Sequence, residues 1–457
     1  MDWHAKARTL NAKGKALAAI PLFRKHLARN PSDRIAWHNL AGALGNEGFH
    51  AEALDAADRA AGLGLKAPET QLVRGRAALH LGRLDEAEAA FRQALAQRPG
   101  DPSAHRELAQ LIWMRTSDAE AAATPLAAAF QREPQNLGLR LVVCEVLQQV
   151  AQEERAVALA LDTAALAPES AEVRYLAARL LLRSGDAMSA LPHAEAAFAL
   201  SGQAASETEL LAQVRLALGD LEEAERLLTM SGCGAIGTER VFAAALQAVI
   251  WRLKGDERYL ELYDYTAKIG SYEIDVPYGW GSLSGYLDDL KADLGARHTF
   301  RNNPFNQSVK GGGSQLGNLA GLGSPALEAW PDAVAGPVRA HFASQGMKPP
   351  PLAEVKRRLK PWSVRLGPGG HHSDHIHPGG LFSSACHLAY ERAGAAPEGW
   401  LRFGKPGLVL PEELDAEYLV KPEPGRLVLF PSYLWHGVVP ISGQAERLTI
   451  ATDVTGA

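Results

Sequence analysis

The chain has 457 residues, of which 47% are hydrophobic and 22% are charged, and its formal net charge at pH 7 is −5. Because an ordinary domain holds about 150 residues, this length predicts about two or three domains. The composition is typical of a globular protein with a sizeable core. The mild acidic balance gives no electrostatic reason to expect a nucleic acid or an anionic membrane as a partner.

The cysteines and the first residues indicate the compartment. Cys144, Cys233 and Cys386 are far apart and form no CxxC pair, which argues against a disulfide framework and a zinc ribbon. The stretch MDWHAKARTLNAKGKALAAI lacks the apolar core of a signal peptide. No uninterrupted apolar run approaches the ~20 residues that span a bilayer. We therefore expect a soluble, cytoplasmic protein.

Glycine recurs at a fixed interval in the first half of the chain. The separations are 34, 34, 103 and 34 residues, and the long interval equals three periods with one inserted residue. The glycines are Gly14, Gly48, Gly82, Gly185 and Gly219, and the two positions without glycine fall at Thr116 and Ala151. An alanine stands five residues after each of these positions: Ala19, Ala53, Ala87, Ala121, Ala156, Ala190 and Ala224. Such self-similarity predicts a stack of equivalent units.

The repeated unit resembles the tetratricopeptide repeat. Its period is 34, with a small residue at the turn, an alanine early in the second helix and a proline before the next unit. The stretch LHLGRLDEAEAAFRQALAQRPGDP, residues 79–102, is close to the family pattern. The resemblance implies an all-α solenoid of about seven repeats over residues 1–236, with a concave surface that binds a peptide or protein.

The composition changes after the repeats. Apolar positions at helical spacing predict a helical connector or cap over residues 237–270. From residue 351 onward, short β-prone runs such as WSVRL, GWLRF and GRLVLFP are separated by Gly and Pro, which predicts a β-sandwich or barrel. Residues 271–457 would form this second domain, with the helical stretch at 324–346 outside the barrel.

The stretch GGHHSDHIHPGG, residues 369–380, offers several metal ligands. His436 follows 59 residues after His377, and Arg447 follows 11 residues later. A ligand pair at i and i+2, a distant histidine and then a basic residue is the arrangement found in Fe(II)/2-oxoglutarate oxygenases. Iron needs one face of its octahedron filled by protein and three positions left open. The arginine can then anchor the distal carboxylate of 2-oxoglutarate.

Two ligand pairs in this stretch compete. If residues 372–377 are extended, His372 and Asp374 share one face, and His375 and His377 share the other. The first pair with His436 would give two histidines and a carboxylate, and the second would give three histidines. Spacing alone leaves both open.

Residues 300–455 resemble the 2OG-Fe(II) oxygenase family that is found behind tetratricopeptide repeats in bacterial proteins. The matching segments are NPFNQSVKGGGSQ, HIHPGGLFSSACHLAY and PGRLVLFPSYLWHGVVPISGQAERLTIATDV. The recurring His-x-His-Pro element falls on His375, His377 and Pro378. The resemblance implies a double-stranded β-helix of the jelly-roll or cupin kind with flanking helices. It implies iron ligands at His375, His377 and His436, and a 2-oxoglutarate anchor at Arg447.

Other residues are expected around this centre. Ser384 and Tyr390 share one face of their strand and could hydrogen-bond 2-oxoglutarate, whereas His387 would face the other way. The Gly-rich residues 310–323 lack the Gly-Lys-Ser/Thr ending of a phosphate-binding loop, so a mobile lid is the preferred interpretation. The substrate entrance would then be bordered by Gln307, Ser308 and Lys310.

The resemblance implies a function. It is that of a dioxygenase using Fe(II), 2-oxoglutarate and O₂ to hydroxylate a peptide or protein recruited by the repeats. Two alternatives remain. The domain could be a three-histidine cupin dioxygenase without 2-oxoglutarate, or a barrel that has lost catalysis within a repeat scaffold for protein–protein interaction.

Overall fold

The computed structural model describes residues 2–230, 240–390, 396–442 and 445–456. The chain divides into two compact units, one of Met1–Val146 with Gly317–Glu328 and the other of Leu147–Leu316 with Ala329–Ala457. The expected boundary at residue 236 and Cys233 lie outside the described residues, whereas Cys144 and Cys386 are buried. No helix in the described part of the chain is both long and apolar enough to cross a membrane.

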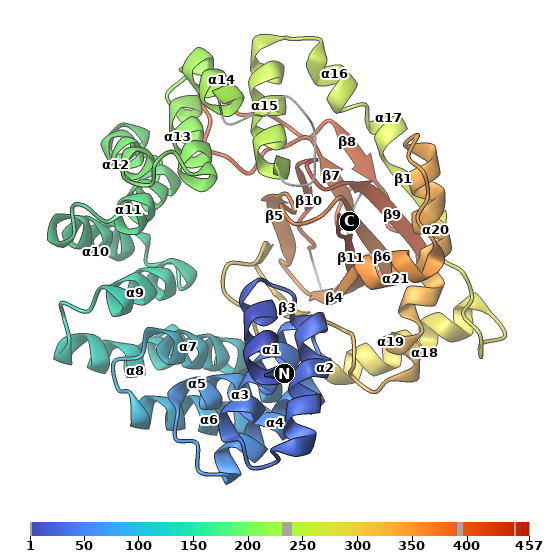
Figure 1. Ribbon diagram of the computed structural model, residues 1–457. Helices are drawn as coiled ribbons and strands as arrows, with labels where there is room; N and C mark the ends of the chain where they lie inside the picture. The colour runs from blue at the N-terminus through green and yellow to red at the C-terminus, as the bar shows by residue number, and fades with distance from the viewer. Residues whose placement is uncertain (1, 231–239, 391–395, 443–444, 457) are drawn as a thin grey trace. The chain divides into compact units, whose positions relative to one another are not determined.

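Helices in consecutive pairs make up the first half of the chain and form an N-terminal helical solenoid (Figure 1). The bounds are α1 (Trp3–Ala12), α2 (Ala16–Arg29), α3 (Arg34–Asn46), α4 (His50–Gly62), α5 (Pro68–His80), α6 (Leu84–Gln97), α7 (Pro102–Thr116), α8 (Ala119–Arg132), α9 (Leu137–Gln149), α10 (Glu153–Leu166), α11 (Ala171–Arg183), α12 (Ala187–Leu200), α13 (Ala205–Ala217) and α14 (Leu221–Met230).

The periodic glycines stand where the first helix of a pair ends. All five have a positive φ, between 70° and 88°, a conformation that glycine adopts without the steric cost of a Cβ atom. At the two positions without glycine, Ser117 and Ala151 adopt the same conformation, each with φ of 57°. The left-handed residue of the fourth unit is thus one position later than the expected Thr116.

The periodic alanines are packing residues, with one shift of register. Six of the seven expected alanines are fully buried. In the fourth unit, Ala122 is fully buried and Ala121 is partly exposed. Since Ser117 and Ala122 both lie one position later than expected, the inserted residue precedes this turn rather than following it.

Six further helices and the strands of the described residues belong to the second compact unit. The short helix α19 (Pro325–Glu328) belongs to the first unit. The helices are α15 (Val241–Lys254), α16 (Arg258–Leu262), α17 (Tyr265–Lys268), α18 (Leu283–Arg297), α20 (Trp330–Ser344) and α21 (Leu352–Arg358). The strands are β1 (Gly270–Glu273), β2 (Val309–Lys310), β3 (Gly313–Leu316), β4 (Leu359–Leu366), β5 (His371–His375), β6 (Phe382–Tyr390), β7 (Leu401–Phe403), β8 (Tyr418–Val420), β9 (Arg426–Pro431), β10 (His436–Val438) and β11 (Arg447–Val454).

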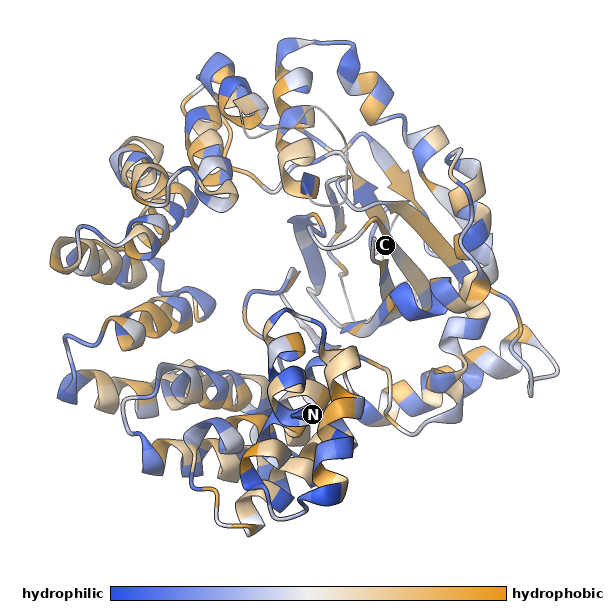
Figure 2. Ribbon diagram, viewed as in Figure 1, coloured by the Kyte–Doolittle hydropathy of each residue, from blue (hydrophilic) through white to orange (hydrophobic). Residues whose placement is uncertain are grey.

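The strands form two antiparallel sheets. The larger has the order β1-β9-β6-β11-β4-β3 and the smaller β2-β5-β10-β7-β8. Helices α18, α20 and α21 pack along the larger sheet (Figure 1), where Trp330 Nε1 donates to Thr452 Oγ1 at 3.0 Å. Figure 2 shows apolar strands β6 and β9, whereas β5 is hydrophilic. The polar strand is the one that carries the histidine-rich stretch.

Helices α15 and α16 hold the segment before β10. Trp435 Nε1 donates to the carbonyl of Ala245 at 3.2 Å, and the hydroxyl of Tyr263 donates to the carbonyl of Tyr433 at 2.9 Å. Trp435 is 3% exposed and Tyr263 is also 3% exposed, so these hydrogen bonds are shielded from water. The position of His436 is therefore tied to the helices that follow the repeats.

Glycine packing inside the repeats can be tested by two matched substitutions. A Cβ atom at Gly75 of α5 would lie 2.3 Å from the ring of the fully buried Phe91, so Gly75→Ala should destabilise the protein by about 1–3 kcal/mol. Gly42 of α3 has no atom within 4 Å of such a Cβ. Gly42→Ala should be neutral or stabilising by up to about 1 kcal/mol, because alanine is the better helix former. Equal unfolding midpoints of the two variants would contradict this packing.

Candidate metal centre

Strand β5 pairs irregularly with β10. His375 lies opposite His436, whereas Val438 lies opposite His372, so β5 holds one residue more than β10 between these pairs. A β-bulge of this kind brings to one face side chains that strict alternation would separate. The alternation expected for residues 372–377 is wrong here, since the rings of His372 and His375 stack with centroids 5.7 Å apart.

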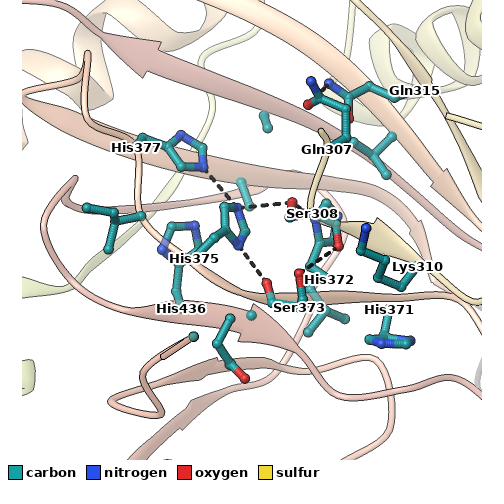
Figure 3. Close-up of a pocket in the computed structure, with 18 of the residues that line it drawn as sticks. Gln307, Ser308, Lys310, Gln315, His371, His372, Ser373, His375, His377 and His436 are labelled. Atoms are coloured by element: carbon teal, nitrogen blue, oxygen red, sulfur yellow. Dashed lines mark hydrogen bonds between the residues drawn. The ribbon is translucent and has the colours of Figure 1, made fainter. Parts of the chain in front are cut away.

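Three imidazoles, those of His375, His377 and His436, meet at the end of β5 (Figure 3). Their candidate ligand nitrogens all lie within 4.8 Å of one another, and the Nε2 atoms of His375 and His377 are 3.1 Å apart. Two nitrogens bound to one metal at about 2.1 Å and at right angles lie about 3 Å apart. The spacing of this pair therefore fits two neighbouring positions of an octahedron.

Each of the three rings is held by an oxygen at its other nitrogen, Nδ1. The partners are the carbonyl of Ser373 for His375 at 2.8 Å, the carboxylate of Asp453 for His377 at 2.7 Å, and the carbonyl of Leu434 for His436 at 2.9 Å. Because these oxygens accept hydrogen bonds, Nδ1 carries the proton and Nε2 keeps its lone pair for a metal.

Burial keeps two of these rings uncharged. Burial lowers the pKa of His375 to about 3, and it holds the pKa of His436 well below the ordinary histidine value. At neutral pH a metal therefore does not compete with protons for these nitrogens. Neutral imidazoles are good ligands for Fe, Zn and Cu, so the donor set fits iron.

The alternative carboxylate, Asp374, is engaged by Arg402. Arg402 donates from Nε to Oδ1 at 2.8 Å and from Nη2 to Oδ2 at 2.7 Å, a bidentate geometry typical of strong ion pairs. His372 Nδ1 lies 2.8 Å from Ser308 Oγ, which is also 3.2 Å from His375 Nε2. The structure thus brings together His375, His377 and His436, and it turns Asp374 toward another partner.

Arg447 begins β11 and lies on the larger sheet, facing the same cavity. Its side chain is buried, and burial lowers the pKa of the guanidinium to about 9, so it remains charged at neutral pH. Its Nε donates to Nδ1 of His387 at 3.2 Å, and no carboxylate in the described ranges forms an ion pair with it. A buried cation whose partner is neutral is a natural binding point for an anion.

His387 was expected to face away from Arg447. The pairing of β6 with β11 shifts between Leu448 and Thr449, so His387 lies opposite Thr449 and on the side of Arg447. Strict alternation along β6 misses this residue, because one extra residue in a strand exchanges its two faces.

The expected cosubstrate residues Ser384 and Tyr390 have other hydrogen-bond partners here. Ser384 lies along the cavity wall, and its hydroxyl donates to the carbonyl of Thr452 at 2.9 Å. The hydroxyl of Tyr390 donates to the carbonyl of Glu398, and Tyr390 is not among the residues that line the cavity.

The cavity around the three histidines has a volume of about 1090 Å³. It is lined by both sheets, by α11 and by the segment that leads into β2, so that Gln307, Ser308 and Lys310 all border it (Figure 3). Gln315 donates to Gln307 across this rim at 2.9 Å. The volume is at the upper end of the range for small-molecule sites, so there is room for more than one small ligand.

The two ligand sets can be distinguished by metal content. His436→Ala should weaken Fe(II) binding by more than the ~10–100-fold that a change outside the ligand shell causes. Asp374→Ala should leave the Fe(II) dissociation constant within about threefold. It should cost about 3 kcal/mol or more of stability, because Arg402 loses its buried partner. Titration of the metal-free variants, with unfolding midpoints alongside, measures both effects. Loss of iron in Asp374→Ala with retention in His375→Ala would reverse the assignment.

Two segments of the sequence match known protein families. Residues 360–453 match the family described as "Putative 2OG-Fe(II) oxygenase", and residues 68–111 match the tetratricopeptide repeat family. No curated protein matches the sequence.

Solved structures also show similarity to this chain. A tetratricopeptide repeat protein from Parabacteroides merdae is 16% identical with a TM-score of 0.38, over 57% of this chain and 96% of that one. Yeast Tom70 is 17% identical with a TM-score of 0.44, over 56% of this chain and 55% of that one. The family matches confirm the resemblance seen in the sequence: the chain joins tetratricopeptide repeats to a domain that matches the 2OG-Fe(II) oxygenase family.

Proposed function

We propose that this protein is a dioxygenase that uses Fe(II), 2-oxoglutarate and O₂ to hydroxylate a peptide or protein side chain. The observation that carries the proposal is the meeting of three imidazole nitrogens and one buried arginine without a carboxylate partner in a single cavity. The family match of residues 360–453 supports it. The two antiparallel sheets around the cavity are the architecture that a double-stranded β-helix requires.

In this proposal His375, His377 and His436 hold the iron through Nε2. When bound, Fe(II) supplies the oxidative decarboxylation of 2-oxoglutarate to succinate and CO₂, with insertion of one atom of O₂ into a C–H bond of the substrate. Three histidines would hold the metal and leave the cavity beside them for the keto acid. The hydrogen bonds at Nδ1 keep the rings from turning away when the metal dissociates.

Arg447 is the residue that orients 2-oxoglutarate. Its guanidinium can donate two parallel hydrogen bonds to the distal carboxylate, which would supply the anion that the buried cation lacks. Thr449 and Ala451 line the cavity beside it and are small enough to leave space for the cosubstrate. His387 fixes the guanidinium through Nε, and Ser384 and Tyr390 stay candidates for further cosubstrate contacts.

The repeats recruit the substrate in this proposal. Helix α11 of the repeats contributes to the cavity wall, so a peptide on the repeats could reach the iron. Gln307, Ser308 and Lys310 would border its entrance. We place the activity in the cytoplasm because the three cysteines of the sequence are far apart and form no CxxC pair.

A three-histidine dioxygenase without 2-oxoglutarate is the second candidate, and the absence of a carboxylate from the histidine cluster of the described residues favours it. Incubation of the protein with Fe(II), 2-oxoglutarate and O₂ separates the candidates, since only the first forms succinate. A non-catalytic scaffold would bind no stoichiometric iron and consume no 2-oxoglutarate. Mass spectrometry of peptides from co-purifying proteins should show a gain of ~16 Da in the first case.

The substitution Arg447→Met tests whether Arg447 binds the distal carboxylate of 2-oxoglutarate. We expect it to change the stability and the activity of the protein in opposite directions. Methionine fills similar space without a charge, and replacing a buried charge by an apolar side chain is often neutral or stabilising. We expect an unchanged or higher unfolding midpoint without 2-oxoglutarate, together with a KM for 2-oxoglutarate raised by at least about 100-fold, since a charge-assisted bidentate contact is lost. The Fe(II) dissociation constant is the control and should not change. Unaltered succinate formation in this variant would rule out the anchoring role.

A further inference from the structure

One end of the cavity carries three cations that the proposed chemistry does not use. Arg179 and Arg183 stand one turn apart on α11 and therefore face the same way. Lys310 of β2 lines the same cavity, and Figure 3 shows it near His372 and Ser308. Burial, with the nearby charge of Arg183 as the second cause, lowers the pKa of Lys310. Arg183 is therefore close enough to repel both Lys310 and Arg179.

None of these cations forms a salt bridge with a described residue, and only the nearby charge of Glu153 partly offsets that of Arg183. The amide of Gln148, turned so that its oxygen faces Arg183, accepts from Nη1 at 2.9 Å and from Nε at 3.0 Å. This neutral partner fixes the guanidinium of Arg183, which lines the cavity. The Nε of Arg179 is buried without any hydrogen-bond partner, and such a group is costly unless a ligand satisfies it.

The charges around the cavity do not balance. Apart from the histidines, five lining side chains are positive and two are negative. Both acids are already engaged, Asp374 by Arg402 and Asp453 by His377 and Ser383. The double positive charge of Fe(II) and the double negative charge of 2-oxoglutarate cancel each other. An excess of three positive charges therefore remains when both are bound.

We propose that Arg179, Arg183 and Lys310 form an anion subsite that binds acidic side chains of a peptide substrate and thereby places a neighbouring residue at the metal centre. This inference rests on the proposed function for the reaction, and on the cavity alone for the binding. The two arginines belong to a repeat helix and the lysine to the small sheet that carries the histidines. A peptide held by all three would thus contact both parts of the cavity wall.

Binding of short labelled peptides to the metal-free, full-length protein tests the subsite. Fluorescence anisotropy would compare hexaglutamate, hexaglutamine and a hexapeptide of alternating phosphoserine and glutamine. We expect hexaglutamate to bind at least about tenfold more tightly than hexaglutamine. The double variant Arg183→Gln/Lys310→Gln should lose that preference. The matched control is Arg357→Gln/Lys421→Gln, which removes one arginine and one lysine at exposed positions outside the cavity and should keep it.

The outcomes separate the subsite from the reaction. If only the phosphopeptide binds in a charge-dependent way, the anion subsite exists but binds phosphoryl groups, and the proposal that it binds carboxylates is wrong. Equal affinities for all peptides, or equal losses in the double variant and its control, would overturn the subsite. Succinate formation by the wild-type protein is measured separately. If succinate is absent while charge-dependent binding persists, the proposed reaction fails and the subsite stands.

Discussion

The hydrogen bond at each Nδ1 is the interaction on which the convergence of His375, His377 and His436 depends. Without it, an imidazole can rotate and present either nitrogen, and three rings would not converge. The acceptors are fixed for different reasons: two are main-chain carbonyls two residues before their own histidine, and the third is the carboxylate of Asp453 on the opposite sheet. The local conformation of the smaller sheet and the spacing between the sheets therefore both determine the ligand geometry.

The site also concentrates features that weaken a folded protein. A buried guanidinium with a neutral partner, buried neutral histidines and a repeated positive charge along one helix face all oppose folding unless ligands compensate. The proposed function supplies a carboxylate for Arg447 and a metal for the histidines, and the proposed anion subsite supplies an acidic peptide for the α11 arginines. The core of the first repeats, by contrast, is apolar.

The sequence predicts the parts of this protein that repeat and misses those that depend on register. A 34-residue period is visible because packing requires glycine and alanine at equivalent places of each repeat. The period predicts the turns of the helix pairs, with an error of one residue at Ser117. The candidate ligands were recognisable by residue type and spacing. The engagement of Asp374 and the contact between His387 and Arg447 were not, because both follow from bulges that no residue type announces. The roles of Arg402 and Asp453 were also missed. An isolated charged residue in a strand looks like a surface residue until its neighbours across the sheet are known.

The hydrogen bond from Trp435 to α15 determines where a stable C-terminal fragment of this protein can begin. Sequence composition places a boundary near residue 270, yet Ala245 and Tyr263 lie before it and cover the residues that immediately precede His436. A fragment that starts at residue 271 would expose the indole of Trp435 to water and release the peptide segment that carries a ligand. A fragment that keeps the environment of His436 therefore includes α15 and α16. The helices after the repeats are as much a part of the barrel as its own strands.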